Sequence, residues 1–289
     1  MFMMRSTACL RSGKRYVRLI RKVAIDAALA AGATIRKSYG NLLQVDKTLP
    51  HDLKLRLDRT CEERILTAIR RRFPAHGVLS EEIGYAPGVD PFLWIVDPMD
   101  GTVNFFHEIP FFCTCVSCHK IKESQGIQGE ILLPDGRAVG SALVSVVYRP
   151  VGEELFTGFL DGGAYLNGRL LHLEHLADLS LAIASLSFGA QDGSVAYIGR
   201  LLPRMVQRAQ KVRSFGSTAL DIAYVAAGRV GAFVQMGTNL WDFAAAAAIL
   251  KEAGGILEAE EYTRRRWKVV AGNPGTFAEV RMIAEGALE

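Results

Sequence analysis

The feature that most constrains this 289-residue chain is an apolar run that ends in two closely spaced carboxylates. Residues 92–96 read Phe-Leu-Trp-Ile-Val, which is typical of a buried strand. Asp97 and Asp100 follow, with Pro98 between them. Because proline cannot donate a ladder hydrogen bond, we expect the strand to end there. Gly101 then permits a sharp turn and a close approach of the backbone to a ligand.

The residues after this turn predict an anion site. Thr102 and its successors are expected to begin a short helix, whose free N–H groups bind anions. Two hard oxygen ligands beside a helix start suit a divalent metal ion and a phosphate together. Taken alone, an ordinary acidic turn is as good an interpretation, because Asp-Pro-x-Asp-Gly is a common turn sequence.

Composition is that of an ordinary soluble globular protein and excludes several classes. Hydrophobic residues make up 49% and charged residues 22% of the chain, which is long enough for one large domain or two smaller ones. The net charge of +4 is modest, so nucleic acid is not an expected partner. No apolar run approaches the roughly 20 residues of a membrane span, so we expect no membrane association.

Cysteine usage indicates a reducing compartment. The five cysteines are an odd number and the sequence has no secretion signal, which together predict reduced thiols and a cytoplasmic location. Three of them, Cys113, Cys115 and Cys118, stand in an apolar, strand-like run without a second group at zinc-site spacing. We interpret them as buried packing thiols.

The N-terminal part reads as helical. Residues 1–15 are rich in Arg and Lys and are interpreted as a short basic extension, which leaves 16–289 for the folded domain. Apolar residues at helical spacing predict helices over 17–39 and 57–73. A loop is predicted between them, over 41–51.

The pattern of strands divides the rest of the chain in two. Up to residue 178, short strands joined by short turns, with the hairpin signal Asn167-Gly168, predict a largely antiparallel sheet. Beyond it, strand and helix alternate more regularly. We therefore expect subdomains of about 16–178 and 179–289. The basic run 264–266 is interpreted as a solvated loop.

Two stretches together resemble a known family. Residues 94–105, Trp-Ile-Val-Asp-Pro-Met-Asp-Gly-Thr-Val-Asn-Phe, resemble the metal-binding signature of the inositol monophosphatase family of Mg²⁺-dependent, lithium-sensitive phosphomonoesterases. Residues 241–255 begin Trp-Asp-x-Ala-Ala and end Glu-Ala-Gly-Gly, and they resemble that family's second signature, whose Asp binds metal. Two such signatures roughly 140 residues apart exceed what chance would give. The resemblance implies an α/β (α+β) layered sandwich, in which a largely antiparallel sheet and a second sheet alternate with helix pairs.

The resemblance implies a metal centre of two or three Mg²⁺ ions. Its ligands would be the carboxylates of Glu81, Asp97, Asp100 and Asp242 and the backbone carbonyl of Met99. From the residues alone, Glu81 and Glu82 would be interpreted as a solvated turn, and Asp242 would be interpreted as a helix cap. Without metal, carboxylates this close would raise one another's pKa values, so bound metal is expected to stabilise the fold.

The resemblance also implies how phosphate is attacked. Amides of Gly101 and Thr102 would hold the phosphate while a metal-activated water attacks phosphorus in line. The Thr102 hydroxyl, paired with Asp58, would orient and deprotonate that water. Thr102, Asp58 and Glu81 are therefore the predicted catalytic residues.

A mobile loop of the family is matched in part. Lys47 and Asp52 agree with the family's loop Lys and Asp in spacing. The stretch 52–58, Asp-Leu-Lys-Leu-Arg-Leu-Asp, has leucines and bases where the family carries small polar residues. This departure weakens the case for metal affinity at the outermost site.

Substrate choice rests on fewer residues. By resemblance, Gly101, Thr102, Ser214, Gln235 and Asp242 line the substrate pocket. Members that hydrolyse inositol phosphates carry a Glu where this chain has Gln235, so a charge-assisted hydrogen bond is lost. Inositol 1-monophosphate or a related sugar or polyol phosphate is the expected substrate. Histidinol phosphate, fructose 1,6-bisphosphate and 3′-phosphoadenosine phosphates stay open.

The resemblance carries expectations about partners. A homodimer is expected, because the family is usually dimeric. Residues 121–139 are longer than the family's tight hairpin and are interpreted as a lid or a dimer contact. Some bacterial members act as transcription or RNA-processing partners, which makes a non-catalytic role the rival class. The intact set of metal carboxylates weighs against an exclusively binding role.

Overall fold

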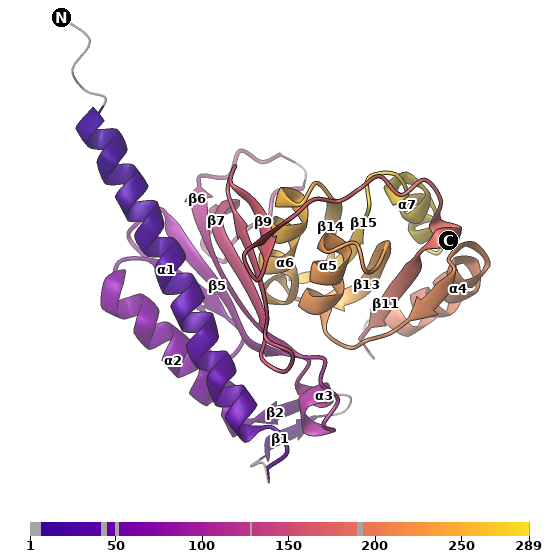
Figure 1. Ribbon diagram of the computed structural model, residues 1–289, viewed down its shortest axis with the longest axis horizontal. Coiled ribbons are helices and arrows are strands. Elements are labelled where there is room, and N and C mark those ends of the chain that lie inside the picture. The colour runs from indigo at the N-terminus through magenta and orange to yellow at the C-terminus, as the bar shows by residue number, and fades with distance from the viewer. Residues whose placement is uncertain (1–6, 42–44, 50–51, 128, 190–192, 289) are drawn as a thin grey trace, which may run out of the picture.

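Helices and sheets alternate in layers in the computed structural model, which describes residues 7–41, 45–49, 52–127, 129–189 and 193–288 (Figure 1). The outer helices α1 (Thr7–Ser38) and α2 (Arg56–Arg72) cover one face of an eight-stranded sheet. Helices α5 (Thr218–Ala226) and α6 (Leu240–Glu252) lie between that sheet and a five-stranded sheet. Helices α4 (Ser194–Arg208) and α7 (Phe277–Glu285) cover the far face of the second sheet. The predicted layered α/β sandwich is confirmed.

The larger sheet is largely antiparallel, as predicted. Among its described strands only β3 and β5 run parallel to each other. In sheet order its strands are β10 (Arg169–Leu171), β9 (Gly163–Leu166), β8 (Glu154–Phe159), β7 (Ala138–Arg149), β6 (Cys113–Lys122), β5 (Phe92–Asp100), β3 (Gly77–Ser80) and β4 (Gly84–Ala86).

The smaller sheet is mixed. Strand β11 runs parallel to β12 and β13, and the remaining pairs are antiparallel. In sheet order its strands are β12 (Lys211–Arg213), β11 (Ile183–Phe188), β13 (Ala232–Thr238), β15 (Arg266–Gly272) and β14 (Ile256–Thr263). Shorter described elements are the antiparallel pair β1 (Val45–Leu49) and β2 (Asp52–Leu55), helix α3 (Thr102–Phe106) and the 3-10 turn Leu179–Leu181.

Helix α1 lies close against strand β7. A Cβ on Gly32 would come within 2.4 Å of the Tyr148 ring, so glycine permits this approach. The helix begins at Thr7 rather than at the predicted residue 17, and the basic residues before Val17 continue it, since Arg and Lys are good helix formers. Neither α1 nor any other helix in the described residues is long and apolar enough to cross a membrane.

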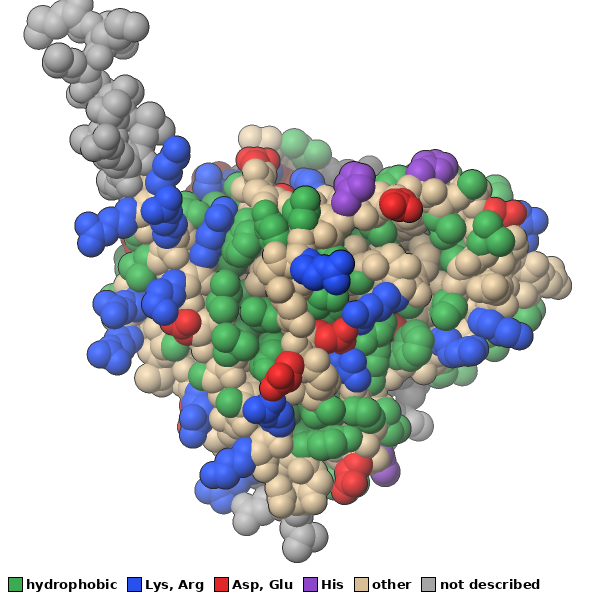
Figure 2. Space-filling view, viewed as in Figure 1, with side chains coloured by type: hydrophobic (Ala, Val, Ile, Leu, Met, Phe, Trp, Pro, Cys, Tyr) green, Lys and Arg blue, Asp and Glu red, His purple; other side chains and the backbone are tan. Residues whose placement is uncertain are grey.

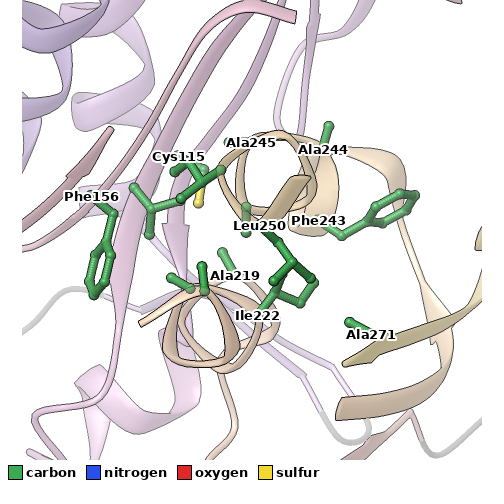
Figure 3. Close-up of a cluster of buried hydrophobic side chains, with 14 of the residues drawn as sticks. Cys115, Phe156, Ala219, Ile222, Phe243, Ala244, Ala245, Leu250 and Ala271 are labelled. Atoms are coloured by element: carbon green, nitrogen blue, oxygen red, sulfur yellow. The ribbon is translucent and has the colours of Figure 1, made fainter. Parts of the chain in front are cut away.

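The middle helices α5 and α6 consist mainly of apolar residues because they lie between the two sheets. Figure 3 shows their buried side chains between Cys115 and Phe156 of the larger sheet and Ala271 of the smaller sheet. The contact is close, since a Cβ on Gly158 would meet Ile249 of α6 at 3.1 Å. Packing on both faces fixes where the first turn of α6 lies, and that turn carries Asp242.

The predicted Asn167-Gly168 hairpin is confirmed. Strands β9 and β10 pair antiparallel on either side of these two residues. Both residues have positive φ, 49° and 78°, which two-residue hairpins of type I′ require.

Candidate functional site

Strand β5 does not end at Pro98, so that prediction is wrong. It continues to Asp100 through a bulge, in which Asp97 pairs with Cys115 and Asp100 with Cys113. Proline is tolerated because its missing donor falls where the bulge interrupts the ladder. The Thr114 hydroxyl donates to the Pro98 carbonyl at 2.9 Å, which satisfies that carbonyl within the bulge.

The turn after β5 agrees with the sequence prediction. Gly101 has φ +94° and immediately precedes helix α3, which begins at Thr102. The Thr102 hydroxyl donates to the carbonyl of Met99 at 3.0 Å. The side-chain amide of Asn104 donates to the carbonyls of Phe111 and Phe215, at 2.8 and 2.7 Å, which ties the turn to the segment that precedes α5.

Replacement of Gly101 by Ala should destabilise the protein by roughly 2–4 kcal/mol, because strain at positive φ adds to a steric clash. A Cβ at Gly101 would meet the Phe111 carbonyl oxygen at 3.0 Å. Gly254 is a matched control, since it has φ +93° and nothing within 4 Å of an added Cβ. Urea unfolding should therefore give a smaller loss, about 1 kcal/mol, for Gly254→Ala. Equal losses in the two variants would contradict the predicted clash.

Glu81 and Asp242 reach the same region from two other elements. Glu81 directly follows β3, which runs parallel to β5, so both strands end at the same edge of the sheet. Asp242 lies in the first turn of α6, where its Oδ2 accepts from the Thr238 hydroxyl and the Asn239 amide, each at 2.8 Å. Asp242 is therefore a helix-capping residue and a member of the cluster at once.

Four acids form one electrostatic cluster. Burial raises the pKa of Asp97 well above its usual range, and the charges of Glu81, Asp100 and Asp242 raise it further. Burial and the charge of Asp242 raise the pKa of Asp100 to about 7, although hydrogen bonds oppose this shift. Burial likewise raises the pKa of Asp242. The structure thus brings together the four carboxylates that the sequence singled out.

The donor set of this cluster fits Mg²⁺ chemically. Among the described residues no three or more Asp, Glu, His or Cys side chains are arranged to hold a metal ion, so the carboxylates would have to close on it. No described residue donates a hydrogen bond to Oδ2 of Asp97 or Oδ1 of Asp242. Hard carboxylate oxygens are what Mg²⁺ prefers, and a cation would remove the mutual repulsion of the buried acids.

Ser217 connects the start of α5 to the cluster. Its hydroxyl caps α5 by accepting from the Leu220 amide at 3.4 Å, and it donates to Oδ2 of Asp100 at 2.7 Å. The amide of Ala219 donates to the same oxygen at 2.7 Å. The start of α5 is therefore held against the carboxylate at the end of β5.

Two residues near the cluster were missed by the sequence prediction. Glu62 of α2 is buried, and its Oε1 accepts from the Ser80 hydroxyl and from the Glu82 amide, the latter at 3.1 Å, so it holds the turn that carries Glu81. Arg266 was interpreted as part of a solvated loop. It instead starts β15, donates to the Gly237 carbonyl at 3.1 Å, and lowers the pKa of Asp242 against the effect of burial. The sequence did contain a signal for Glu62, because it is an acidic residue on the apolar face of a predicted helix.

The remaining predicted residues lie in various settings. Asp58 is buried in the first turn of α2, and its pairing with Thr102 stays a prediction. Gln235 is 7% exposed on β13 and accepts from the Thr218 hydroxyl at 2.7 Å, whereas Ser214 is exposed after β12. Residues 45–49 form strand β1 where a loop over 41–51 was predicted, so that prediction is wrong, because this segment pairs antiparallel with β2. Residues 47 and 52 lie on these two strands, and the side chains of Lys47 and Asp52 lie outside the described part of the structure.

The cysteines agree with the packing interpretation. Cys61, Cys113, Cys115 and Cys118 are buried free thiols. The sulfur atoms of Cys113 and Cys115 lie 3.7 Å apart, and burial raises the pKa of both. Protonated, buried thiols of this kind pack as small apolar side chains.

Comparison with known proteins identifies the family. The model of the inositol monophosphatase family matches residues 17–127 and 138–285, and the gap falls in the loop between β6 and β7. The chain is 33% identical over 267 residues to the Nus factor SuhB of Pseudomonas aeruginosa, covering 88% of this chain and 92% of that protein. It is 33% identical over 277 residues to inositol monophosphatase 1 of Solanum lycopersicum, covering 91% and 94%. The crystal structure of the extragenic suppressor protein suhB from Bartonella henselae matches with a TM-score of 0.79 and 29% identity, covering 91% of this chain and 97% of that one. The chain belongs to the inositol monophosphatase family.

Proposed function

We propose that this protein is a Mg²⁺-dependent phosphatase that hydrolyses a small phosphate monoester. The main support is the cluster of the buried Asp97 with the half-buried Glu81, Asp100 and Asp242, at the ends of β3 and β5 and the start of α6. Such a cluster is costly without a cation, because burial and mutual repulsion both oppose ionisation. It has a clear use in phosphoryl transfer, where bound metal offsets the charge of the phosphate.

Each residue of the cluster then has a role. The four carboxylates and the Met99 carbonyl would hold two or three Mg²⁺ ions, and the chemistry that these ions would supply is charge neutralisation at the phosphate and a lowered pKa of the attacking water. Amides of Gly101 and Thr102 would bind the phosphate, since no side chain at Gly101 blocks its approach. The Thr102 hydroxyl would orient the water, and Asp58 would take up its proton.

A phosphomonoester panel tests the proposal. Purified protein is given inositol 1-monophosphate, histidinol phosphate, fructose 1,6-bisphosphate and 3′-phosphoadenosine 5′-phosphate, with Mg²⁺ or with a chelator. We expect inorganic phosphate to be released in Mg²⁺ but not in the chelator, and fastest from inositol 1-monophosphate or another polyol phosphate. Lithium should inhibit this release. Release that is absent from every substrate, or that persists in the chelator, would contradict the proposal.

Gln235 is the proposed specificity residue. It is nearly buried and already pairs with Thr218 through Oε1, so Gln235→Glu would add a charge without a large change in shape. This charge should favour a polyol hydroxyl and repel a second anionic group. We expect the ratio of kcat/KM for inositol 1-monophosphate over fructose 1,6-bisphosphate to rise about tenfold. A ratio that stays within twofold of the wild-type ratio would show that Gln235 does not line the substrate pocket.

We also propose a homodimer. The loop between β6 and β7 is a candidate contact because Ile127 and Leu132 are exposed there, at 58% and 49%. Arg137 pairs with Asp135 within the loop at 2.9 Å and donates to the hydroxyl of Tyr85 on β4 at 3.1 Å, and the contact with Tyr85 suits a fixed loop better than a lid. Light scattering should give a dimer for the wild type and a monomer when the loop is shortened.

A second candidate is a SuhB-type role as a partner in transcription or RNA processing. Helices α1 and α2 hold fourteen bases and four acids, a net charge of +10 against +4 for the whole chain, so the rest carries −6. Figure 2 shows Lys and Arg side chains gathered over these helices. Such a basic face suits a polyanion, although the modest total charge had argued against one.

Binding of labelled RNA tests this second role independently of catalysis. Charge reversal of the exposed Arg70, Arg71 and Arg72 on α2 should weaken binding and reduce its salt dependence. Reversal of the exposed Arg200 and Arg204 on α4 is the control. If both sets of substitutions weaken RNA binding equally, or if the wild-type protein does not bind RNA, phosphatase activity is left as the sole candidate function.

The four described cysteines of the protein are buried free thiols, which supports a location in the reducing cytoplasm.

A further inference from the structure

A cavity of about 560 Å³ lies on the flank of α6, between that helix, strands β6 to β8 and strand β14. Its helical wall is made of small residues, Ala244, Ala247 and Ala248, and its opposite wall includes Ser145 of β7. Asp242 in the first turn of the same helix is not among the described lining residues. The cavity is therefore separate from the carboxylate cluster, and its volume is within the range of small-molecule sites.

Ser145 is a polar side chain left unpaired at the wall of this cavity. It is 0% exposed, and its hydroxyl has no hydrogen-bond partner among the described residues. Its neighbours in the sheet are Ser117 on β6 and Gly158 on β8. A buried hydroxyl without a partner is unfavourable, so a ligand that reaches it gains a hydrogen bond that the empty protein lacks.

Two other polar residues that line the cavity, Ser141 and Lys251, are exposed, whereas the less exposed polar groups are already engaged. His119 uses both ring nitrogens, Nδ1 with the Gly140 carbonyl at 3.2 Å and Nε2 with the Ser117 hydroxyl at 2.9 Å. Burial lowers the pKa of His119 to about 4, so the ring is neutral near pH 7. Glu252 accepts from two backbone amides, those of residues 161 and 163, at 3.1 and 3.0 Å. The buried part of the wall thus offers one unpaired hydroxyl, and the two charged lining residues, Lys251 and Glu252, lie in the last turn of α6.

We propose that this cavity binds a small, uncharged and mainly apolar molecule that carries one hydroxyl or carbonyl group, which pairs with Ser145. The apolar wall of α6 supplies contact area, and a charged group placed beside the buried Ser145 would be disfavoured because a buried charge without a partner is unfavourable. The volume suits a ligand of about two fused rings. This site is independent of the proposed phosphatase activity.

A pair of probes tests the proposal on the full chain. 2-Naphthol and naphthalene share one ring system and differ by a hydroxyl, and their binding is followed by fluorescence. We expect both to bind wild type, and Ser145→Ala to weaken 2-naphthol about three- to tenfold while leaving naphthalene unchanged. Ser141 lines the same cavity but is exposed, so Ser141→Ala is the matched control and should change neither affinity.

Filling the cavity gives a second test. Ala247→Leu should abolish binding of both probes, whereas Ala278→Leu on the exposed face of α7 should not. The proposal is overturned if neither probe binds up to its solubility limit, or if Ser145→Ala affects both probes alike. Binding that survives in a folded Ala247→Leu protein overturns it as well. If that variant does not fold, the contrast between the probes at Ser145 still decides.

Discussion

Asp97→Asn is expected to reduce Mg²⁺-dependent phosphate release at least a hundredfold while the protein stays folded. Asp97 is 2% exposed and interacts with the charges of the three other acids, so it is the central carboxylate of the cluster. The amide of Asn keeps the shape but loses the charge that would hold the metal. Because each 1.4 kcal/mol of transition-state stabilisation is a factor of ten in rate, the loss of several kcal/mol exceeds a hundredfold.

Folding and activity should separate clearly in this variant. In a chelator, Asp97→Asn should be at least as stable as wild type, because it removes a buried acid that its neighbours repel. Asp90→Asn is the control, since Asp90 is partly exposed and lies 3.9 Å from the ring of His76, whose pKa is lowered by burial. It should retain full activity. An Asp97→Asn enzyme with more than about a tenth of wild-type turnover would contradict the assigned role.

The metal-free protein should lose stability as pH rises from about 4 to above 7. The pKa of Asp100 is about 7 in the folded protein against 3.8 in the unfolded chain. The folded state therefore binds the proton more tightly, so this contribution is fully present below pH 3.8 and is lost as pH passes 7. For Asp100 alone the loss amounts to about 4 kcal/mol, at 1.36 kcal/mol per tenfold change in proton affinity.

Mg²⁺ should reverse this dependence, because it binds the ionised carboxylates and stabilises the folded state by mass action. Urea unfolding from pH 4 to 8, in a chelator and in Mg²⁺, measures both effects. Asp100→Asn should flatten the chelator profile, whereas Asp135→Asn should not, since the pKa of Asp135 is lowered to about 2. A flat wild-type profile in the chelator, or an equal slope in Mg²⁺, would contradict the buried acid cluster.

The sequence predicted local features of the site better than their three-dimensional surroundings. The apolar run at 92–96, the turn at Gly101 and the helix after it follow from short-range rules, and all are present. The bulge at Pro98 was not predictable, because it depends on which residues of β6 pair with Asp97 and Asp100. The geometry of a strand end is set by its neighbour as well as by its own residues.

Supporting residues were harder to find than ligands. Glu62 and Arg266 are distant in sequence from the signatures, and their roles depend on contacts with Ser80 and Gly237 that no local pattern encodes. Glu62 still stands out in retrospect, since it shares the buried face of α2 with apolar residues. Arg266 carries no such mark, because a run of three arginines is typical of a solvated loop.

Anomalous diffraction from crystals grown with Mn²⁺ in place of Mg²⁺ tests the central claim most directly. At least one anomalous peak is expected among the carboxylates of Glu81, Asp97, Asp100 and Asp242, about 2.0–2.3 Å from their oxygens. The peak should be lost in Asp97→Asn crystals. Peaks only elsewhere on the protein, in crystals of an enzyme whose phosphate release still requires Mg²⁺, would show that these four acids are not the metal centre.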